Sequence, residues 1–282
     1  MTREQKRKIS TVIRYTLLIA VGFIMVYPLI WMVGATFKTN SEIFTSAWFW
    51  PKNPVFDGYE NAFKNYGGKI NLILSMLNTY KIVIPKVVFT IVSATITAYG
   101  FARFNFKGKG FMFSMMMATL FLPQVVLNAP QYIMFNKWGW TNSYLPLVIP
   151  SLFAADTYFV FMLIQFLRGV PKELEEAAGL DGCNIVQLYT RIVMPMLKPG
   201  IVVVAIWTFL TCWNEFFLAL CTMTKATTKT LPLIAQQYKG VYNSQPGILF
   251  AILIIITIPM VIFYCVVQKQ FVKGMTAGAV KG

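Results

Sequence analysis

Six long apolar runs alternate with shorter polar and basic segments along this chain. A helix rises about 1.5 Å per residue and the hydrocarbon core of a bilayer is about 30 Å thick, so about 20 apolar residues suffice to cross it. The pattern therefore predicts an all-α membrane protein, a single transmembrane domain over residues 1–282 with spans at about 12–36, 76–101, 111–135, 143–167, 199–222 and 247–268.

The polar segments between these runs predict the orientation. If the N-terminus is cytoplasmic, fifteen of the 25 Lys and Arg residues lie on the inner side, eight on the outer side, and two in the second span. Cytoplasmic loops carry an excess of Lys and Arg, so both termini are expected on the cytoplasmic side of the cell membrane. The segment 37–75, rich in aromatic residues, Pro, Gly and Asn, is then an outer cap; residues 168–198 form the longest inner loop, and 269–282 a cytoplasmic tail.

Composition narrows the chemistry that this chain can perform. With 57% hydrophobic and 12% charged residues it has a membrane composition, and the net charge of +15 is spread in short clusters, which suits a lipid surface and not nucleic acid. The chain has no histidine, no C-x-x-C pair and no G-x-x-x-x-G-K-[ST] loop. We expect no enzyme activity, no metal and no bound cofactor, so a partner must supply the energy for any transport.

Four of the ten carboxylates lie close together in the inner loop: Glu173, Glu175, Glu176 and Asp181. Pro171 suits the first turn of a helix, acids favour its positive end, and Gly182 can adopt the left-handed conformation that ends it. Asn184 and Gln187 have the spacing of a capping box, and the apolar residues after them repeat as on an amphipathic helix up to Pro195. The loop is therefore predicted to be two short helices that meet near Gly182.

One side of the first short helix carries almost no side chains, since Ala177, Ala178 and Gly179 follow one another there. Such a surface allows another backbone to approach closely. The spacing E-A-A, three residues, Gly, nine residues, I-x-x-P resembles the signature loop of ABC-importer permeases, here at Glu176, Ala177, Ala178, Gly182, Ile192 and Pro195. Met194 stands where that family usually has Leu, a near-isosteric change.

The resemblance extends over nearly the whole chain. The stretches "ARFNFKGKG", "LPQVVLNAPQYIMFNKWGWTNSYLPLVIP", "WNEFF", "TLPL" and "FVKGMTAGAVKG" are similar to permeases of the carbohydrate-uptake type, related to the smaller permease subunit of the maltose transporter. This resemblance implies a type I ABC-importer permease fold of six helices, working by alternating access for a sugar or oligosaccharide.

The same resemblance implies the partners. They are a second, related permease, two ATPase subunits that carry ATP and Mg, and an extracytoplasmic solute-binding protein. The inner loop would be a coupling-helix pair that docks in a cleft of the ATPase, with Glu176 facing a basic residue there, and its gathered carboxylates would form the contact surface. The tail would reach between the two ATPase subunits.

Polar residues inside the spans are candidates for a substrate path, because ionisable groups are costly there. Lys86 and Glu215 lie at similar expected depth, and we hypothesise that they pair. Asp156 falls near the middle of the fourth span, and Pro123 with Gln124 predicts a bend and a polar group. Trp207, Trp213 and Asn214 offer aromatic and amide faces for a sugar. That these residues only tie helices together is an equally open interpretation.

Three other functions stay open as alternatives. An ABC permease could carry a non-sugar solute, such as a modified peptide or a polyol phosphate. An ion-driven secondary transporter would need an inverted repeat and broken helices, neither of which the sequence indicates. An intramembrane enzyme would need catalytic groups that the spans do not offer.

Overall fold

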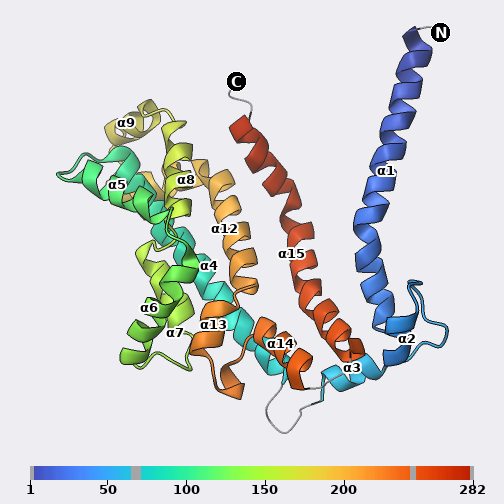
Figure 1. Cartoon of the computed structure of the whole chain (residues 1–282). Helices are drawn as coiled ribbons and strands as arrows, with labels where there is room; N and C mark the ends of the chain where they lie inside the picture. The colour runs from blue at the N-terminus through green and yellow to red at the C-terminus, as the bar shows by residue number, and fades with distance from the viewer. Residues whose placement is uncertain (1–2, 65–70, 242–245, 280–282) are drawn as a thin grey trace. The chain divides into compact units, whose positions relative to one another are not determined.

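The structure is a computed structural model that describes residues 3–64, 71–241 and 246–279, with the backbone alone at residues 3, 4, 6, 238–241 and 270–279. Every regular element in these ranges is helical (Figure 1). Residues 65–70 of the predicted outer cap and residues 280–282 of the predicted tail lie outside the described ranges. Within them, the all-α prediction is confirmed.

Four of the predicted spans correspond to helical stretches long and apolar enough to cross a bilayer: Arg7–Ala35, Leu72–Arg103, Leu145–Arg168 and Pro246–Lys269. Two further pairs pass the same test but are bent. Lys109–Thr119 and Gln124–Lys137 meet at 104°, and Ile185–Met196 and Lys198–Trp213 meet at 74°. The described residues therefore contain four candidate spans, or up to six if each bent pair counts as one.

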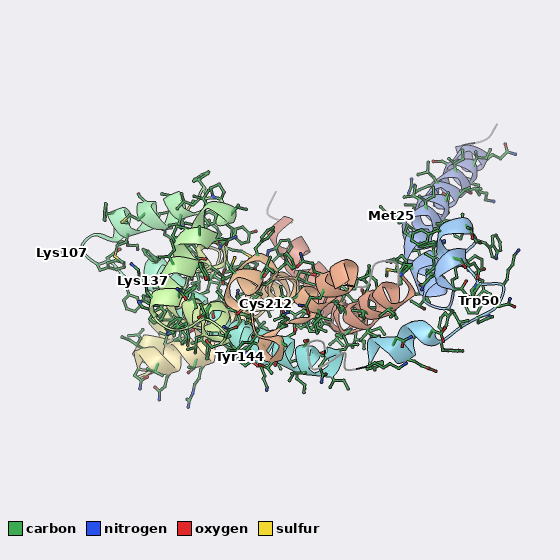
Figure 2. The ribbon with its side chains drawn as sticks, turned by 60° about the horizontal axis from the view of Figure 1, so that its bottom comes forward. Met25, Trp50, Lys107, Lys137, Tyr144 and Cys212 are labelled. Carbon is green, nitrogen blue, oxygen red and sulfur yellow. The ribbon has the colours of Figure 1, made fainter. Side chains whose placement is uncertain are left out.

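The chain divides into two compact units, the first formed by residues 1–66 and 235–259. Its elements are α1 (Arg3–Ala35), α2 (Asn40–Thr45), α3 (Asp57–Ala62), most of α14 (Leu231–Val241) and the start of α15 (Pro246–Ala279). Side chains of α1 are largely exposed, Met25 by 73%, as expected for a helix that faces lipid or another subunit (Figure 2).

The turn that follows α1 is closed by a buried lysine. Lys38 is 2% exposed, and its Nζ donates to the carbonyl oxygens of Ser46, at 3.0 Å, and Trp48, at 2.5 Å. The same ammonium lies 5.2 Å from the ring centre of Trp31. A Cβ at Gly34 would overlap the carbonyl of Phe49, so this turn needs glycine there. The first part of the predicted outer cap is thus an ordered structure.

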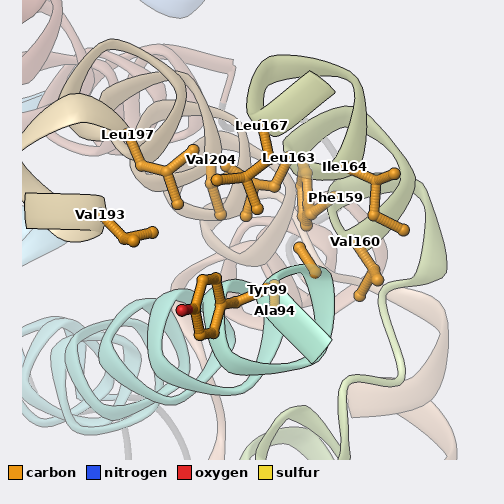
Figure 3. Close-up of a cluster of buried hydrophobic side chains, with 11 residues drawn as sticks. Ala94, Tyr99, Phe159, Val160, Leu163, Ile164, Leu167, Val193, Leu197 and Val204 are labelled. Atoms are coloured by element: carbon orange, nitrogen blue, oxygen red, sulfur yellow. The ribbon is translucent and has the colours of Figure 1, made fainter. Parts of the chain in front are cut away.

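The second unit, residues 67–234 and 260–282, is built around the long helix α4 (Leu72–Arg103). Two helices pack on it, α8 (Thr157–Arg168) and α12 (Lys198–Trp213). Their shared core contains Tyr99 of α4, Leu163 of α8 and Val204 of α12, together with two residues of the inner loop, Val193 and Leu197 (Figure 3). The inner loop is therefore part of the hydrophobic core of this unit.

Shorter elements complete the second unit around these three helices. They are α5 (Lys109–Thr119), α6 (Gln124–Lys137), α7 (Leu145–Val148), η1 (Ile149–Phe153), α9 (Glu173–Leu180), α10 (Ile185–Leu188), η2 (Tyr189–Val193), α11 (Met194–Met196), α13 (Phe217–Thr222) and η3 (Ala226–Thr228). Figure 1 shows α9 at the end of α8.

Three of the predicted spans are interrupted by breaks in helical geometry. The bend expected at Pro123 is confirmed, because α5 ends at Thr119 and α6 begins at Gln124. A second break follows η1, where Ala154 has a left-handed φ of 51°, and a third separates α12 from α13. Our expectation that broken helices are absent was therefore wrong, since neither Ala154 nor the stretch after Trp213 carries a strong local breaking signal.

Candidate functional site

The inner loop forms the two short helices that its sequence predicts. The first, α9, begins at Glu173 with three acids in its first turn and ends at Leu180, and Gly182 follows with φ +83°. Asn184 and Gln187 then form the complete capping box, in which each side chain accepts from the other residue's backbone N–H, at 2.9 and 3.0 Å. We call residues 170–197 the elbow.

The second helix of the elbow contains a widened turn whose cause is Pro195. Residues Tyr189–Val193 are π-helical, and the N–H of Met194 donates to the carbonyl of Tyr189. Pro195 has no N–H to donate to Arg191, and its ring would press on that carbonyl in a regular α-turn. Opening the turn relieves this conflict and sets the direction in which the chain enters α12.

The outer surface of the elbow is both acidic and apolar. Glu173, Glu176, Ala177, Gly179 and Asp181 are exposed, while Ala178 is buried against the unit. Four large apolar side chains surround them in the open: Leu174, Leu180, Ile185 and Val186, with exposed fractions of 46, 91, 63 and 68%. An apolar patch of this kind beside small residues is typical of a protein interface.

Of the residues of the signature motif that remain, Gly182 and Pro195 are exposed and Ile192 is half-buried. Ile192 and Pro195 both belong to the widened helix, Pro195 as the second residue of α11. The motif thus combines residues that shape the elbow, Gly182 and Pro195, with residues that form its outer surface, Glu176 and Ala177.

One carboxylate of the elbow is turned inward, against our expectation that the whole acidic group faces a partner. Glu175 Oε1 lies 2.5 Å from Nε of Arg103 on α4, and its Oε2 accepts from the hydroxyl of Tyr99 at 3.3 Å. Both charged side chains are nearly buried, at 9% exposed for Arg103 and 12% for Glu175. The reason is the cationic end of α4, which offers Glu175 a partner inside the chain.

The second unit also contains a cavity of about 530 Å³ lined by both polar and apolar residues from several helices. Five of the seven residues predicted for a substrate path line it: Lys86, Gln124, Asp156, Trp207 and Glu215. Three of these stand at the helix breaks, Gln124 at the start of α6, Asp156 immediately before α8 and Glu215 between α12 and α13. Irregular backbone inside a membrane is tolerated where it lines a cavity or is buried in protein, which fits this arrangement.

Lys86 and Glu215, which we expected to pair, do not pair in this structure. Both lie in the described part of the chain and line the cavity, but their charged atoms are not within 4.0 Å of each other. Glu215 Oε1 instead accepts from the backbone N–H of Leu218 at 3.0 Å, which stabilises the first turn of α13. Asp156 accepts from the hydroxyl of Thr90 at 3.4 Å.

Trp213 and Asn214 do not line the cavity. Trp213 is fully buried, with its ring centre 5.4 Å from that of Phe209 and 5.3 Å from that of Tyr80. Asn214 donates to the carbonyl of Leu210 on its own helix. Trp213 therefore ties α12 to α4 through Tyr80, whereas Asn214 bonds to the end of its own helix, and neither lies in the cavity wall.

Sequence reasoning missed several cavity residues, among them Tyr158, Thr211 and Gln131. A signal was present for Gln131, because Gln124, Asn128 and Gln131 repeat at i, i+4 and i+7 and so share one face of α6. The amide of Gln124 lies 3.4 Å from the side-chain oxygens of both other residues. Among the described residues, no group of three Cys, Asp or Glu side chains could hold a metal ion.

Comparisons with known proteins agree on the class of this chain. Residues 64–277 match the family described as binding-protein-dependent transport system inner membrane component. The diacetylchitobiose uptake system permease protein DasC of Streptomyces coelicolor is 31% identical over 261 residues, 92% of each chain. The sulfoquinovosyl glycerol transport system permease protein SmoH of Agrobacterium fabrum is 29% identical, over 91% of this chain and 89% of its own.

A solved structure has the same fold. A chain of a bacterial ABC transporter involved in the import of the acidic polysaccharide alginate matches with a TM-score of 0.82 at 19% identity, over 96% of this chain and 99% of that one. The elbow and five of the six apolar runs lie within the matched family region, and the first run, 12–36, precedes it. The chain therefore belongs to the family of binding-protein-dependent transport system inner membrane components, the permease subunits of ABC importers.

Proposed function

We propose that this chain is a permease subunit of a bacterial ATP-driven importer and forms half of the translocation path for a carbohydrate. A second, related permease forms the other half, and a separate pair of ATPase subunits binds ATP and Mg. An extracytoplasmic solute-binding protein delivers the sugar or oligosaccharide. The names of the relatives, an uptake system for diacetylchitobiose and one for sulfoquinovosyl glycerol, support a carbohydrate.

The observation that carries this proposal is the outer surface of the elbow. It presents Glu176, Ala177 and Gly179 in the open, while Ala178 and Val193 are buried in the unit. A projection with a small-sided outer face and a buried inner face can enter a cleft of another protein and transmit its movement. We infer that the ATPase supplies this cleft and a basic residue opposite Glu176.

The cavity supplies a candidate path for the solute. Trp207 and Tyr158 offer aromatic faces, and Gln124, Thr211 and the nearby charged groups offer hydrogen bonds to hydroxyls. Alternating access would open this cavity first to the binding protein and then to the cytoplasm, as the ATPases close and reopen. The excess of Lys and Arg in the predicted inner segments supports a location in the cell membrane with both termini in the cytoplasm.

A cysteine cross-link tests the elbow. Ala177→Cys is introduced after the four native cysteines have been replaced, because Cys183 lies in the elbow itself. We expect a cross-link to the ATPase in the assembled importer. The matched control is Thr227→Cys, which is also exposed but lies in η3 on a predicted outer loop, and it should give no adduct. Absence of the Ala177→Cys adduct in every nucleotide state contradicts the proposal.

A separate experiment tests the substrate class. Radiolabelled oligosaccharides and monosaccharides are offered to proteoliposomes that contain the importer and the binding protein encoded beside it. Uptake of a carbohydrate that depends on ATP supports the proposal. Uptake of only a non-sugar solute, such as a peptide or a polyol phosphate, would support the importer function but contradict a carbohydrate substrate.

A further inference from the structure

Arg103 and Tyr99 fasten the elbow to α4 through three hydrogen-bonding contacts, two of them to the nearly buried carboxylate of Glu175. Its Nε lies 2.5 Å from Glu175 Oε1, and its Nη2 donates to the carbonyl of Val170 at 2.9 Å. Tyr99, one turn earlier on α4, donates to the other oxygen of Glu175 at 3.3 Å. We propose that this group, the α4 clamp of Arg103, Tyr99, Glu175 and Val170, transmits movement of the elbow to α4. The role assigned to the clamp rests on the proposed function.

Chain connectivity explains why α4 needs such a clamp. The elbow continues directly from α8 through residues 169 and 170 and runs directly into α12 at Leu197. The peptide bonds therefore force α8 and α12 to follow the elbow. Helix α4 ends at Arg103, 72 positions before Glu175, so only non-covalent contacts can move it together with the elbow.

A second set of contacts extends the attachment along α4. The hydroxyls of Tyr189, in the widened turn, and Thr95, two turns before Arg103, lie 2.7 Å apart. The rings of Tyr189 and Tyr99 are 5.5 Å apart. Val193 and Leu197 of the elbow join the apolar core that contains Ala94, Ala98 and Tyr99 (Figure 3). The elbow therefore contacts about three turns of α4 and not a single point.

The opposite half of α4 is fastened to different loops. Asn78 is fully buried, donates to the carbonyls of Thr227 at 2.8 Å and Lys229 at 3.1 Å, and accepts from the hydroxyl of Tyr144 at 2.7 Å. Thr79 accepts from the N–H of Leu231 at 3.0 Å. One helix thus connects the elbow at one end with the segment 226–231 at the other, past Lys86 in the cavity wall. A helix held at both ends can carry a displacement along its length.

Because the clamp contains a nearly buried ion pair, loss of either Arg103 or Glu175 should disrupt it. Removing one member of a buried ion pair leaves the charge of the other uncompensated, and Gln at position 175 does this to Arg103 while keeping the shape of the side chain. Lysine at position 103 keeps the charge but cannot reach Glu175 and Val170 with one planar fork. Lys107, exposed and four residues further on, has the same charge without the clamp contacts and is the matched control (Figure 2).

The test uses the complete importer in proteoliposomes, with native cysteines replaced and Thr211→Cys added in the cavity wall. A membrane-impermeant maleimide reports exposure of the cavity with and without MgATP. With an intact clamp, we expect MgATP to change the labelling rate by about tenfold, within the range of ordinary allosteric coupling. Arg103→Ala and Glu175→Gln should bring this ratio close to one, Arg103→Lys should give an intermediate ratio, and Lys107→Ala should leave it unchanged.

Two further measurements distinguish the role of the clamp from effects on assembly of the importer and on docking of the elbow to the ATPase. Only importer that retains its ATPase subunits is measured, and the Ala177→Cys cross-link should persist in Glu175→Gln. A full MgATP response in Arg103→Ala or in Glu175→Gln would overturn the clamp. Loss of the Ala177→Cys cross-link with an intact clamp would instead overturn the proposed function, and the clamp's role with it.

Discussion

The hydroxyl groups of Tyr189 and Thr95 lie 2.7 Å apart, although 94 positions separate the two residues. The hydroxyl of Thr95 also donates to the carbonyls of Ile91 and Val92 on its own helix. Tyr189 is half-buried, and its ring is tilted 49° from that of Tyr99. This contact joins the widened turn of the elbow to the middle of the inner half of α4.

Tyr189→Phe removes only the hydroxyl from this contact. Thr95 keeps its backbone acceptors, so the loss should be close to the net value of one hydrogen bond, about 1 kcal/mol in the free energy of unfolding. We expect a small fall in the midpoint of thermal unfolding and a partial loss of the MgATP response in the cavity-labelling assay. Thr190→Val is the control, since Thr190 is exposed and bonds to its own helix. Equal effects of the two changes would contradict a role for Tyr189 in the attachment.

Gly182→Ala should destabilise the junction between the two helices of the elbow. Gly182 has φ +83°, where a Cβ costs about 1–2 kcal/mol, and no nearby atom obstructs a methyl group there, so the cost is conformational. Hydrogen exchange of the α9 amides should become faster. Gly179→Ala is the matched control, because Gly179 lies inside α9 and a Cβ there also meets nothing within 4 Å. Faster exchange in Gly179→Ala as well would show that the conformation of Gly182 is not the cause.

Local signals in the sequence were sufficient to predict the shape of the elbow. Gly182 and the pair Asn184 and Gln187 each act on their own few residues of backbone, and their effects appear where expected, whereas Pro171 lies two residues before α9 and not at its first position. The bend at Pro123 belongs to the same class, since proline lacks the N–H that a helix needs. The signature motif likewise identified the surface of the elbow from spacing alone.

Long-range partners could not be predicted in the same way. Arg103 fitted the positive-inside pattern, and nothing in the sequence distinguished it from Lys107 or paired it with Glu175, 72 positions away. We paired Glu215 with Lys86 because the two residues are expected at similar depth in the membrane. In the structure, Glu215 instead accepts from a backbone N–H that the helix break leaves free. Ala154 gave no warning of its left-handed conformation, because alanine carries no local signal for a positive φ.

The two tryptophans of α12 should respond differently to truncation. Trp213 is fully buried and stacks on Phe209, so Trp213→Ala should lower the free energy of unfolding by about 3–5 kcal/mol and reduce the amount of folded protein. Trp207 is 49% exposed and lines the cavity, so Trp207→Ala should leave folding nearly unchanged and lower transport. Thermal unfolding and uptake are measured on the same preparations. Normal transport in Trp207→Ala would argue that this part of the cavity wall does not meet the solute.

Lys38 should stabilise the first unit through its buried hydrogen bonds and not through its net charge alone. Lys38→Met keeps the length of the side chain but leaves the carbonyls of Ser46 and Trp48 without their donor, which costs about 1–3 kcal/mol. We expect faster proteolysis within residues 39–50. Lys52→Met, at an exposed position in the same outer segment, should have little effect. Equal sensitivity of both variants would mean that the lost charge, and not the buried contacts, determines the result.

Exchanging the charges of Lys86 and Glu215 should not restore transport. Glu215 accepts from the N–H of Leu218 and so stabilises the start of α13, a role that lysine cannot fill because it has no acceptor. Glu215→Gln keeps an acceptor oxygen and should therefore fold and assemble better than Glu215→Lys. In the double variant Lys86→Glu/Glu215→Lys, we expect uptake no higher than in Glu215→Lys alone, at equal amounts of assembled importer. Recovery of uptake in the double variant would show that the two charges approach each other at some stage of the transport cycle, in a conformation different from the one described.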